Sequence, residues 1–392
     1  MFTFFREPRA RLSGLQRWLI LTLLLLVMTL VSSYAPVAHA EGAPAVTTED
    51  MILYWLPNAQ ANKTVCNDGS AAGYYWRPGS GDGVNRWVIF LQGGGMCNDN
   101  ASCDARQDPI NGTPGLMTNR NWPPTEPGEG ILSPSDVINP DFYNANHVYV
   151  RYCSSDSWSG DRPASPATGG YAFRGKRIVR AVINALMDPA ITPSPNLAEA
   201  RDVLFTGTSA GGCAVLVHLD WLAGVLPQAT VRGIDDAGWL QNIEPFDKTL
   251  PWPSEQLAVG YAFWNGWVDN SCAAAYPGSP SLCYFGIYAY PHLAAEMAVQ
   301  AAQRDMQVLT EWYGITDPTQ PDQETYINEV FAPAVRDSLA TVTVAFSPAG
   351  TNHGLLSHDT FHTLLVNGYS LEDIVGNWEF GRPGPLKVIG EW

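Results

Sequence analysis

Residues 203–217 read Val-Leu-Phe-Thr-Gly-Thr-Ser-Ala-Gly-Gly-Cys-Ala-Val-Leu-Val, an apolar run, a Gly-x-Ser-x-Gly turn and a second apolar run. This order predicts a strand, a sharp turn centred on Ser209 and a helix, an arrangement called a nucleophile elbow. Gly207 and Gly211 lack the side chains that would collide where the two elements approach each other. The five-letter pattern alone also fits a glycine-rich turn with an ordinary serine, so the flanking strand and helix decide the interpretation.

Strand-length apolar runs alternate with amphipathic runs of helix length along the chain. We expect strands at residues 87–91, 147–152, 203–206, 230–234, 296–301 and 341–346, and helices at 171–187, directly after Ser209 and near 323–340. Such alternation indicates an α/β fold, in which helices cover both faces of a mostly parallel sheet, as in α/β-hydrolase-like proteins. The Gly-, Pro-, Asn- and Trp-rich segments 93–145 and 236–290 are interpreted as long loops above the site. We expect one catalytic domain over residues 41–392.

The first 40 residues have the order typical of a secretory signal peptide. They contain basic residues, an apolar core and a small-residue cleavage site: Arg6, Arg9, Arg11 and Arg17, then residues 18–31, then Ala38-His39-Ala40. An uncleaved membrane anchor is the alternative, but the apolar run is shorter than the about 20 residues that span a bilayer. We therefore expect a secreted protein, extracellular or periplasmic, without stable membrane insertion after signal cleavage.

The 392-residue chain is acidic, with a net charge of −16 and an isoelectric point near 4.7. Nucleic acids and anionic membranes bind basic patches, so this charge disfavours both and argues mildly against a densely charged polysaccharide. Fourteen tryptophans and sixteen tyrosines exceed the needs of a core of this size, and such rings commonly line sugar or acyl pockets. We expect a monomer that takes an acylated small molecule or polysaccharide.

Seven cysteines in an exported chain predict disulfides and one remaining thiol. Short spacing favours two pairs, and positions beside early strands favour a third: Cys97–Cys103, Cys272–Cys283 and Cys66–Cys153. Cys213 remains, on the apolar face of the elbow helix, where a thiol is inert packing. Metal ligation is the alternative, but the sequence has neither Cys-x-x-Cys nor His-Glu-x-x-His, so we expect no metal.

A serine nucleophile needs an imidazole to take its proton and a carboxylate to orient that imidazole. In α/β hydrolases the chain order is serine, acid, histidine. His353 follows an expected strand and the breakers 348–350, so it lies in a loop at the carboxyl edge of the sheet, where the elbow opens. We predict His353 as the base and His358 as the reserve. His218 lies within the elbow helix and points away from the turn.

Three aspartates compete for the role of acid. Asp305 follows the expected strand 296–301 and precedes His353 by 48 residues, the position of an acid at the end of the penultimate strand. Asp236, beside Asp235, ends the strand that follows the elbow helix, and Asp269 lies in a later loop. Spacing alone favours Asp305 without excluding the other two.

Acyl transfer also needs donors for the oxyanion. Residues 90–97, Phe-Leu-Gln-Gly-Gly-Gly-Met-Cys, form a glycine-rich loop after an early strand, and its backbone N–H groups are unobstructed. The N–H of Ala210, directly after the nucleophile, joins them. A phosphate-binding turn is the alternative, but the loop lacks a Lys-Ser/Thr ending and a helix signature behind it.

Several motifs resemble those of the pectin acetylesterase and Notum family of secreted serine carboxylesterases, over about residues 65–360. They are 66–70 with 73–75, 90–97 with 103–104, 120–123 with 130–133, 143–146, 152–156 with 158–160, 207–212, 236–239, 264–266, Cys272, Cys283 and 290–291. The resemblance implies Ser209 as nucleophile, Asp305 as acid and His353 as base. It also implies oxyanion donors at Gly94, Gly95 and Ala210.

The sequence departs from the family pattern near the acyl pocket. Gly95 and Met96 stand where Notum-like and plant-type members carry bulky aromatic residues, and Gln92 stands where a glutamate is usual. Cys213 has no evident partner cysteine. These departures leave the shape of the acyl pocket open.

The sequence thus predicts a secreted serine carboxylesterase that needs no cofactor. We expect it to remove acetyl groups from a polysaccharide or glycoside through an acyl-enzyme on Ser209. The alternatives are a Notum-like deacylase that removes a fatty acyl group from a lipidated protein, a peptidase with the same triad, and a non-catalytic carbohydrate-binding homologue.

Overall fold

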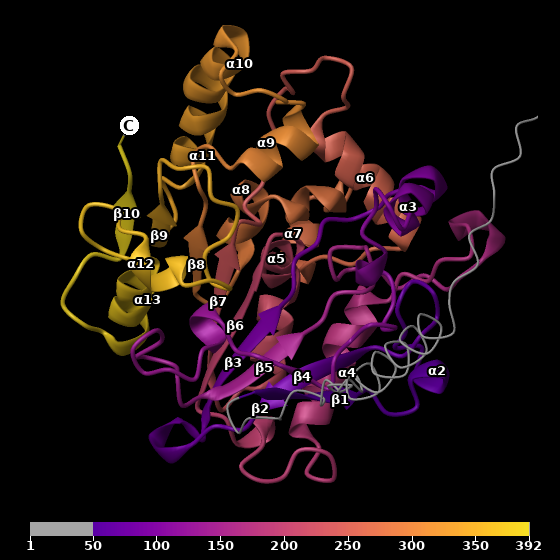
Figure 1. Cartoon of the computed structure of the whole chain (residues 1–392), viewed down its shortest axis with the longest axis vertical. Coiled ribbons are helices and arrows are strands. Elements are labelled where there is room, and N and C mark those ends of the chain that lie inside the picture. The colour runs from indigo at the N-terminus through magenta and orange to yellow at the C-terminus, as the bar shows by residue number, and fades with distance from the viewer. Residues whose placement is uncertain (1–49, 392) are drawn as a thin grey trace, which may run out of the picture. The chain divides into compact units, whose positions relative to one another are not determined.

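The computed structural model describes residues 50–391, so the predicted signal peptide lies outside the described residues. A ten-stranded sheet forms the centre, in the order β10-β9-β8-β7-β6-β3-β5-β2-β1-β4 (Figure 1). The strands are β1 (Met51–Trp55), β2 (Gly73–Arg77), β3 (Arg86–Leu91), β4 (Thr125–Glu126), β5 (Asn146–Val150), β6 (Asp202–Thr208), β7 (Thr230–Asp236), β8 (Met297–Gln300), β9 (Val344–Ser347) and β10 (Lys387–Ile389). From β10 to β5 all neighbours run parallel, whereas β2, β1 and β4 add an antiparallel edge.

Hydrophobic cores cover both faces of this sheet. In β3, Trp87 and Ile89 belong to one core, which includes side chains of α4 and α5, while Val88 and Phe90 belong to the other, which includes α13. This alternation follows from the two-residue period of a strand whose faces are both buried. The predicted α/β-hydrolase-like fold is confirmed.

The helices account for most connections between strands. They are α2 (Ala59–Asn62), α3 (Asn100–Gln107), α4 (Gly175–Met187), α5 (Ala210–Val225), α6 (Pro253–Trp264), α7 (Asn270–Ala275), α8 (Gly286–Ala289), α9 (Met306–Tyr313), α10 (Pro321–Tyr326), α11 (Ala332–Ser338), α12 (Thr360–Thr363) and α13 (Leu371–Phe380). The helix expected near 323–340 is α10 and α11 joined by a π-helical segment, Ile327–Phe331. Within residues 50–391, no helix is long and apolar enough to cross a membrane.

The segment 236–290 differs from the expected long loop because it contains α6, α7 and α8. Pro253 occupies the first position of α6, where a proline has no hydrogen bond to lose. The Asp269 side chain accepts hydrogen bonds from the amides of Ser271 and Cys272 and caps α7. Pro253 and Asp269, residue types that are common in loops, therefore mark the beginnings of helices in this segment.

Three disulfides join the pairs expected from the sequence: Cys66–Cys153, Cys97–Cys103 and Cys272–Cys283. Cys213 is free and buried, and its Sγ lies 3.1 Å from the carbonyl oxygen of Gly238. Burial raises the pKa of the Cys213 thiol, so the thiol stays protonated and unreactive near neutral pH.

Candidate active site

Ser209 forms the turn between β6 and α5, with φ 59° and ψ −120°. A non-glycine residue with positive φ is strained by about 1–3 kcal/mol, and such strain is found at functional sites. The Ser209 amide donates to the carbonyl of Asp236 at 2.7 Å, which fixes the turn. A Cβ on Gly207 or Gly211 would lie 2.5 or 2.0 Å from the Leu91 carbonyl oxygen. The sequence predicts a collision between β6 and α5, and a Cβ on Gly207 would indeed lie 2.6 Å from the Gly211 carbonyl carbon. The close approach of both glycines to β3 is a further requirement that the structure adds.

His353 lies in the loop after β9 and pairs with Asp305, the residue that caps α9. The distance from His353 Nδ1 to Asp305 Oδ2 is 2.7 Å, and the other Asp305 oxygen accepts the Val308 amide at 3.1 Å. Burial disfavours the charged imidazole, but the hydrogen bond and the charge of Asp305 outweigh it and raise the pKa of His353 above its usual value. With Nδ1–H donated to the carboxylate, Nε2 carries the free lone pair.

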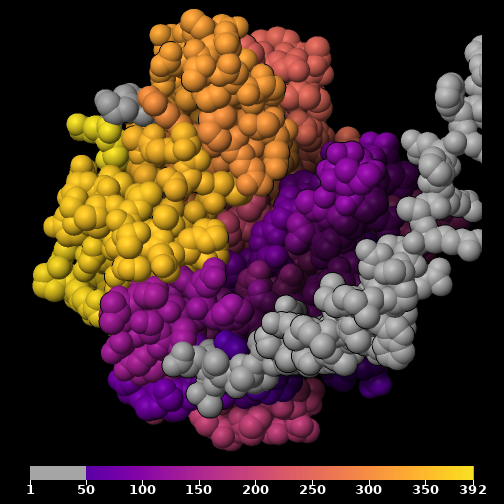
Figure 2. Space-filling model, viewed as in Figure 1, coloured from indigo at the N-terminus to yellow at the C-terminus, as the bar shows by residue number. Residues whose placement is uncertain are grey.

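Nε2 of His353 is buried and has no hydrogen-bond partner among the described residues. His353 and Ser209 line the same cavity, which has a volume of about 480 Å³. In Figure 2 the surface is hollowed where the purple segment of α3, the orange segment of α9 and the yellow segment that follows β9 meet. The cavity brings together residues from five regions of the chain: Gly94, Gly95, Met96, Asn98, Arg106, Thr113, Leu116, Ser209, Ala210, Cys213, Ala237, Leu240, Gln256, Gln307, Val308, Glu311, Trp312 and His353.

The other histidines named from the sequence lie elsewhere. His358 is exposed and does not line the cavity. His218 is fully buried in α5, and its Nε2 lies 2.8 Å from the Trp158 carbonyl oxygen. Burial lowers the pKa of His218 to about 3, so it stays neutral. His353 is therefore the histidine that the structure brings to Ser209.

Asp236 has a different position from Asp305. Its carboxylate accepts the Thr208 hydroxyl at 2.5 Å and the amides of Leu355 and Leu356 at 3.0–3.1 Å. It thus connects Thr208, the residue before Ser209, to the loop that carries His353. Since Asp269 caps α7, Asp305 alone among the three expected acids contacts the His353 ring within the described residues.

The glycine loop contributes two peptide N–H groups to the cavity, and the first residue of α5 contributes a third. The amides of Gly94, Gly95 and Ala210 find no acceptor within residues 50–391 and are free to bind an oxyanion. Gly94 and Gly95 have φ of 139° and 65°, which favour glycine. The Gly94 carbonyl accepts a hydrogen bond from Arg106, and the Gly95 carbonyl accepts the Tyr152 hydroxyl at 3.0 Å. The Arg106 contact thus holds the Gly94–Gly95 peptide, whose N–H belongs to Gly95.

Arg106 lies in the space beside Gly95, where an aromatic residue at position 95 would place its side chain. A Cβ on Gly95 would find the Arg106 guanidinium at 3.6 Å as its nearest neighbour. Trp158 does not fill this space, because it is fully buried and donates from its ring to the Gln92 carbonyl at 3.0 Å. The neighbour of Gly95 in the cavity is therefore a cation, and Met96 and the ring of Trp312 are further lining residues.

Sequence reasoning missed Arg106 and Glu311, the two charged residues of the cavity besides His353. A signal for Arg106 exists in the Cys97–Cys103 pair, which ties α3 to the glycine loop and leaves Arg106 one helical turn beyond Cys103. Glu311 lies on α9 two turns after the Asp305 cap, and nothing in its sequence neighbourhood distinguishes it.

A mostly parallel sheet, a strained serine elbow and a buried Asp–His pair in one cavity place the chain among the α/β-hydrolase-like proteins. The chain belongs to the pectinacetylesterase family, whose model, described as Pectinacetylesterase, matches residues 45–329. This confirms the family resemblance inferred from the sequence motifs.

Two relatives show the extent of the similarity. Palmitoleoyl-protein carboxylesterase NOTUM of Drosophila melanogaster is 35% identical over 331 residues, 81% of this chain and 47% of that relative. The Homo sapiens protein of the same name is 33% identical over 345 residues, 84% of this chain and 66% of that relative. The chain thus spans about half to two thirds of the length of these relatives.

A solved structure with a similar fold is that of the Wnt deacylase Notum from Drosophila. It superposes with a TM-score of 0.79 at 32% sequence identity, covering 88% of this chain and 97% of that chain. The similarity therefore covers most of this chain and nearly all of that one.

Proposed function

We propose that this protein is a secreted serine carboxylic-ester hydrolase with the triad Ser209, His353 and Asp305. The observation that carries the proposal is the 2.7 Å contact between His353 and Asp305, with an unpartnered Nε2 in a cavity that Ser209 lines. The family membership supports the same chemistry, because the curated relatives are carboxylesterases by name.

In this mechanism His353 Nε2 takes the proton of the Ser209 hydroxyl as Oγ attacks the ester carbonyl. Asp305 keeps Nδ1 protonated and stabilises the imidazolium that forms. The amides of Gly94, Gly95 and Ala210 donate to the oxyanion, and the imidazolium then protonates the departing alcohol. Water, activated by the same imidazole, hydrolyses the acyl-enzyme and restores Ser209.

We infer that the acyl group is acetyl and that the alcohol half belongs to a polysaccharide. The cavity has charged or amide side chains on several sides, among them Arg106, Gln256, Gln307 and Glu311. Burying a fatty acyl chain against such groups would remove water from those of their donors and acceptors that the protein itself does not satisfy, which costs free energy. Sugar hydroxyls can satisfy them.

A second candidate follows from the relatives, whose names specify a palmitoleoyl-protein substrate. Met96, Leu116, Leu240 and Trp312 give the cavity an apolar share that an acyl chain could contact. Rates on p-nitrophenyl acetate, octanoate and palmitate separate the two functions. Each buried methylene contributes up to about 0.8 kcal/mol, so kcat/KM that climbs from acetate to octanoate supports the fatty deacylase, and a fall supports the acetylesterase.

Three disulfides among the described residues support export, because such bonds persist in oxidising compartments. Sequencing the N-terminus of the secreted protein tests the predicted cleavage after Ala40.

A further inference from the structure

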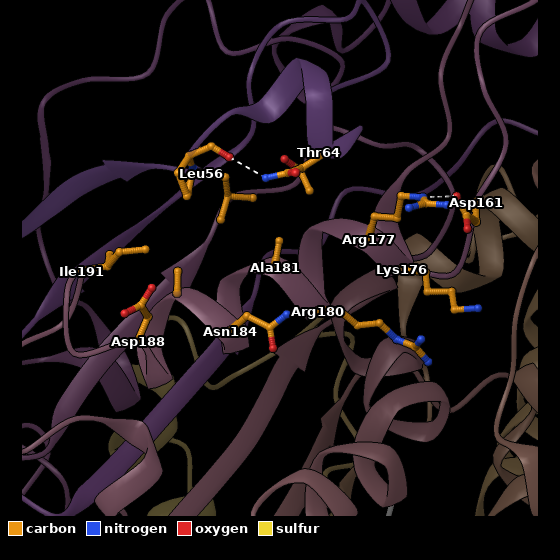
Figure 3. A pocket seen from close by; sticks show the side chains of 13 residues that line it. Leu56, Thr64, Asp161, Lys176, Arg177, Arg180, Ala181, Asn184, Asp188 and Ile191 are labelled. Carbon is orange, nitrogen blue, oxygen red and sulfur yellow. Dashed lines mark hydrogen bonds and ion pairs between the residues drawn. The ribbon is translucent and has the colours of Figure 1, made fainter.

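Arg106 is a cation in the candidate active-site cavity that no carboxylate neutralises. Its side chain is partly buried, yet it forms no ion pair with any residue of the described range 50–391. Arg177, which lines a second cavity along α4, is by contrast paired with the carboxylate of Asp161 (Figure 3). Arginines are rarely withdrawn from water without such a partner. The charge of Arg106 is therefore available to an anionic group of a ligand.

Two of the three nitrogens of this guanidinium group are already used by the protein. Nε donates to Ser155 Oγ at 2.9 Å, and Nη2 donates to the Gly94 carbonyl oxygen. Nη1 makes no hydrogen bond to a residue that the structure describes, and it is the atom that lies 3.6 Å from the position of a Cβ on Gly95. The contacts of Nε and Nη2 thus fix the orientation of the group and leave the donors of Nη1 free beside the glycine loop.

Nη1 lies within reach of an acyl group that is bound for hydrolysis. In the proposed mechanism the Gly95 amide donates to the oxyanion, so the oxyanion lies about 2.9 Å from the Gly95 nitrogen. With the covalent geometry of Gly95 and the 3.6 Å to Nη1, the oxyanion and Nη1 are at most about 9 Å apart. An acetyl group ends in a methyl and offers Nη1 no acceptor. A chain of three or four carbons that ends in a carboxylate does offer one.

The electrostatics of the cavity favour a carboxylate at this position. Burial lowers the pKa of Arg106 below its usual value, because the cavity solvates the guanidinium poorly. An arginine nevertheless keeps its proton near neutral pH, and its hydrogen bonds to a carboxylate are roughly twice as strong as those between neutral groups. Glu311 lines the same cavity, but it is exposed and its Oε1 accepts the Gln307 amide at 3.1 Å. Glu311 therefore does not take the place of a bound anion at Arg106.

We propose that the protein also hydrolyses esters whose short acyl group ends in a carboxylate, such as succinyl, and that Arg106 Nη1 binds this carboxylate. The inference rests on the proposed ester hydrolysis and adds a second class of acyl group to acetyl. Ser209 Oγ forms the succinyl-enzyme as the alcohol leaves with the proton that His353 carries, and water then releases succinate and restores the serine. Arg106 is in this reaction a specificity-determining residue as well as a contact of the Gly94 carbonyl.

The test compares three esters of one alcohol, so that the contacts of the alcohol cancel. They are the 6-O-acetyl, 6-O-succinyl and 6-O-(4-methylpentanoyl) derivatives of methyl glucoside, and the last has the shape of the succinyl ester without its charge. Release of methyl glucoside from each ester gives kcat/KM. For the wild-type protein we expect kcat/KM to be at least about tenfold higher for the succinyl ester than for the 4-methylpentanoyl ester, the gain expected from a hydrogen bond between charged groups.

Four variants assign this preference to Arg106. Arg106→Met should lower the succinyl-to-acetyl ratio of kcat/KM at least about tenfold, because the ratio cancels any loss that comes from the glycine loop. Arg106→Lys should keep part of the ratio, since an ammonium retains the charge. Glu311→Gln should raise the ratio about twofold by removing a like charge from the cavity, which keeps the test decisive if the Arg106 variants fold poorly. Arg201→Met, at an exposed arginine outside the cavity, is the control and should leave the ratio unchanged.

Equal kcat/KM for the succinyl and 4-methylpentanoyl esters in the wild-type protein, or an unchanged ratio in Arg106→Met, would overturn the inference. Calorimetry on Ser209→Ala separates this failure from that of the proposed function. The succinyl ester should bind to this variant at least about tenfold more tightly than the 4-methylpentanoyl ester, and adding Arg106→Met should remove the difference. If the wild-type protein hydrolyses none of the three esters, the proposed function is contradicted, and the calorimetry still decides whether Arg106 binds a carboxylate.

Discussion

The carboxylate of Asp236 accepts the backbone amide of Leu355 across 119 residues of sequence, at 3.0 and 3.1 Å. Because the same carboxylate accepts the Thr208 hydroxyl, it connects the elbow to the loop that carries His353. The charge of Asp236 also contributes to the raised pKa of His353. In the proposed mechanism Asp236 is thus a positioning residue for His353, while Asp305 contacts the imidazole itself.

Asp305→Asn and Asp236→Asn should therefore differ. The first should lower kcat by roughly 10⁴, the loss seen when the orienting acid of a serine triad is replaced. The second should lower it less and destabilise the fold by about 2 kcal/mol, since several hydrogen bonds to a buried charge weaken. Ester hydrolysis and urea unfolding of both variants measure this, with Asp269→Asn as the control for a capping aspartate. A larger activity loss in Asp236→Asn than in Asp305→Asn would transfer the acid role to Asp236.

The pH dependence follows from the raised pKa of His353. The base must be neutral to accept a proton, so kcat/KM should rise with pH through an apparent pKa above about 6.5, the usual histidine value. Asp236→Asn removes a negative charge near the imidazole and should move that limb to lower pH. A limb below the usual histidine value in the wild-type protein, or an unshifted limb in the variant, contradicts the assignment of His353.

Ser209→Ala should abolish hydrolysis and leave the fold intact. The elbow depends on Gly207, Gly211 and the Ser209 amide, and no hydrogen bond of the Ser209 hydroxyl is needed to hold it. Loss of a triad nucleophile lowers kcat by at least about 10³. Steady-state rates and circular dichroism check the two parts, and more than a tenth of wild-type activity would exclude Ser209 as the nucleophile.

The fold and the elbow could be predicted because their signals are local. Apolar periodicity reveals the strands and helices, and the Gly-x-Ser-x-Gly turn lies within five residues of sequence. The contact of Gly207 and Gly211 with Leu91 of β3 is not local and appears only in the structure. The role of Asp236 could not be predicted, since three aspartates follow strands or loops at one edge and their contacts depend on distant segments. The position of Arg106 in the cavity could not be predicted for the same reason. The helices of residues 236–290 were not predicted because a proline that begins a helix cannot be told from a loop proline by composition alone.

Gly211→Ala should destabilise the protein by several kcal/mol. The added Cβ would lie 2.0 Å from the Leu91 carbonyl oxygen, and backbone atoms of β3 and α5 would have to separate. Gly224→Ala is the matched control in the same helix, because a Cβ there meets nothing within 4 Å. That substitution should stabilise by about 0.5–1 kcal/mol through helix propensity. Equal unfolding free energies for the two variants would refute the close approach of α5 to β3.

Arg106 should act on catalysis through the Gly94–Gly95 peptide. Its guanidinium donates to the Gly94 carbonyl and, at 2.9 Å, to Ser155 Oγ, which orients the Gly95 amide towards the cavity. Arg106→Met keeps an apolar stem and removes these donors, so kcat on p-nitrophenyl acetate should fall about tenfold. That loss is smaller than the 10²–10³ for deleting an oxyanion donor outright, because the peptide remains.

Arg106→Lys should recover part of this loss, because an ammonium keeps the charge but not the fork that reaches both acceptors. KM for the acetate ester should change by less than about twofold in both variants, since the interaction strengthens in the transition state. Arg120→Met, at an exposed arginine outside the cavity, is the control. A rise in KM with unchanged kcat would show that Arg106 binds the substrate and does not position the oxyanion loop.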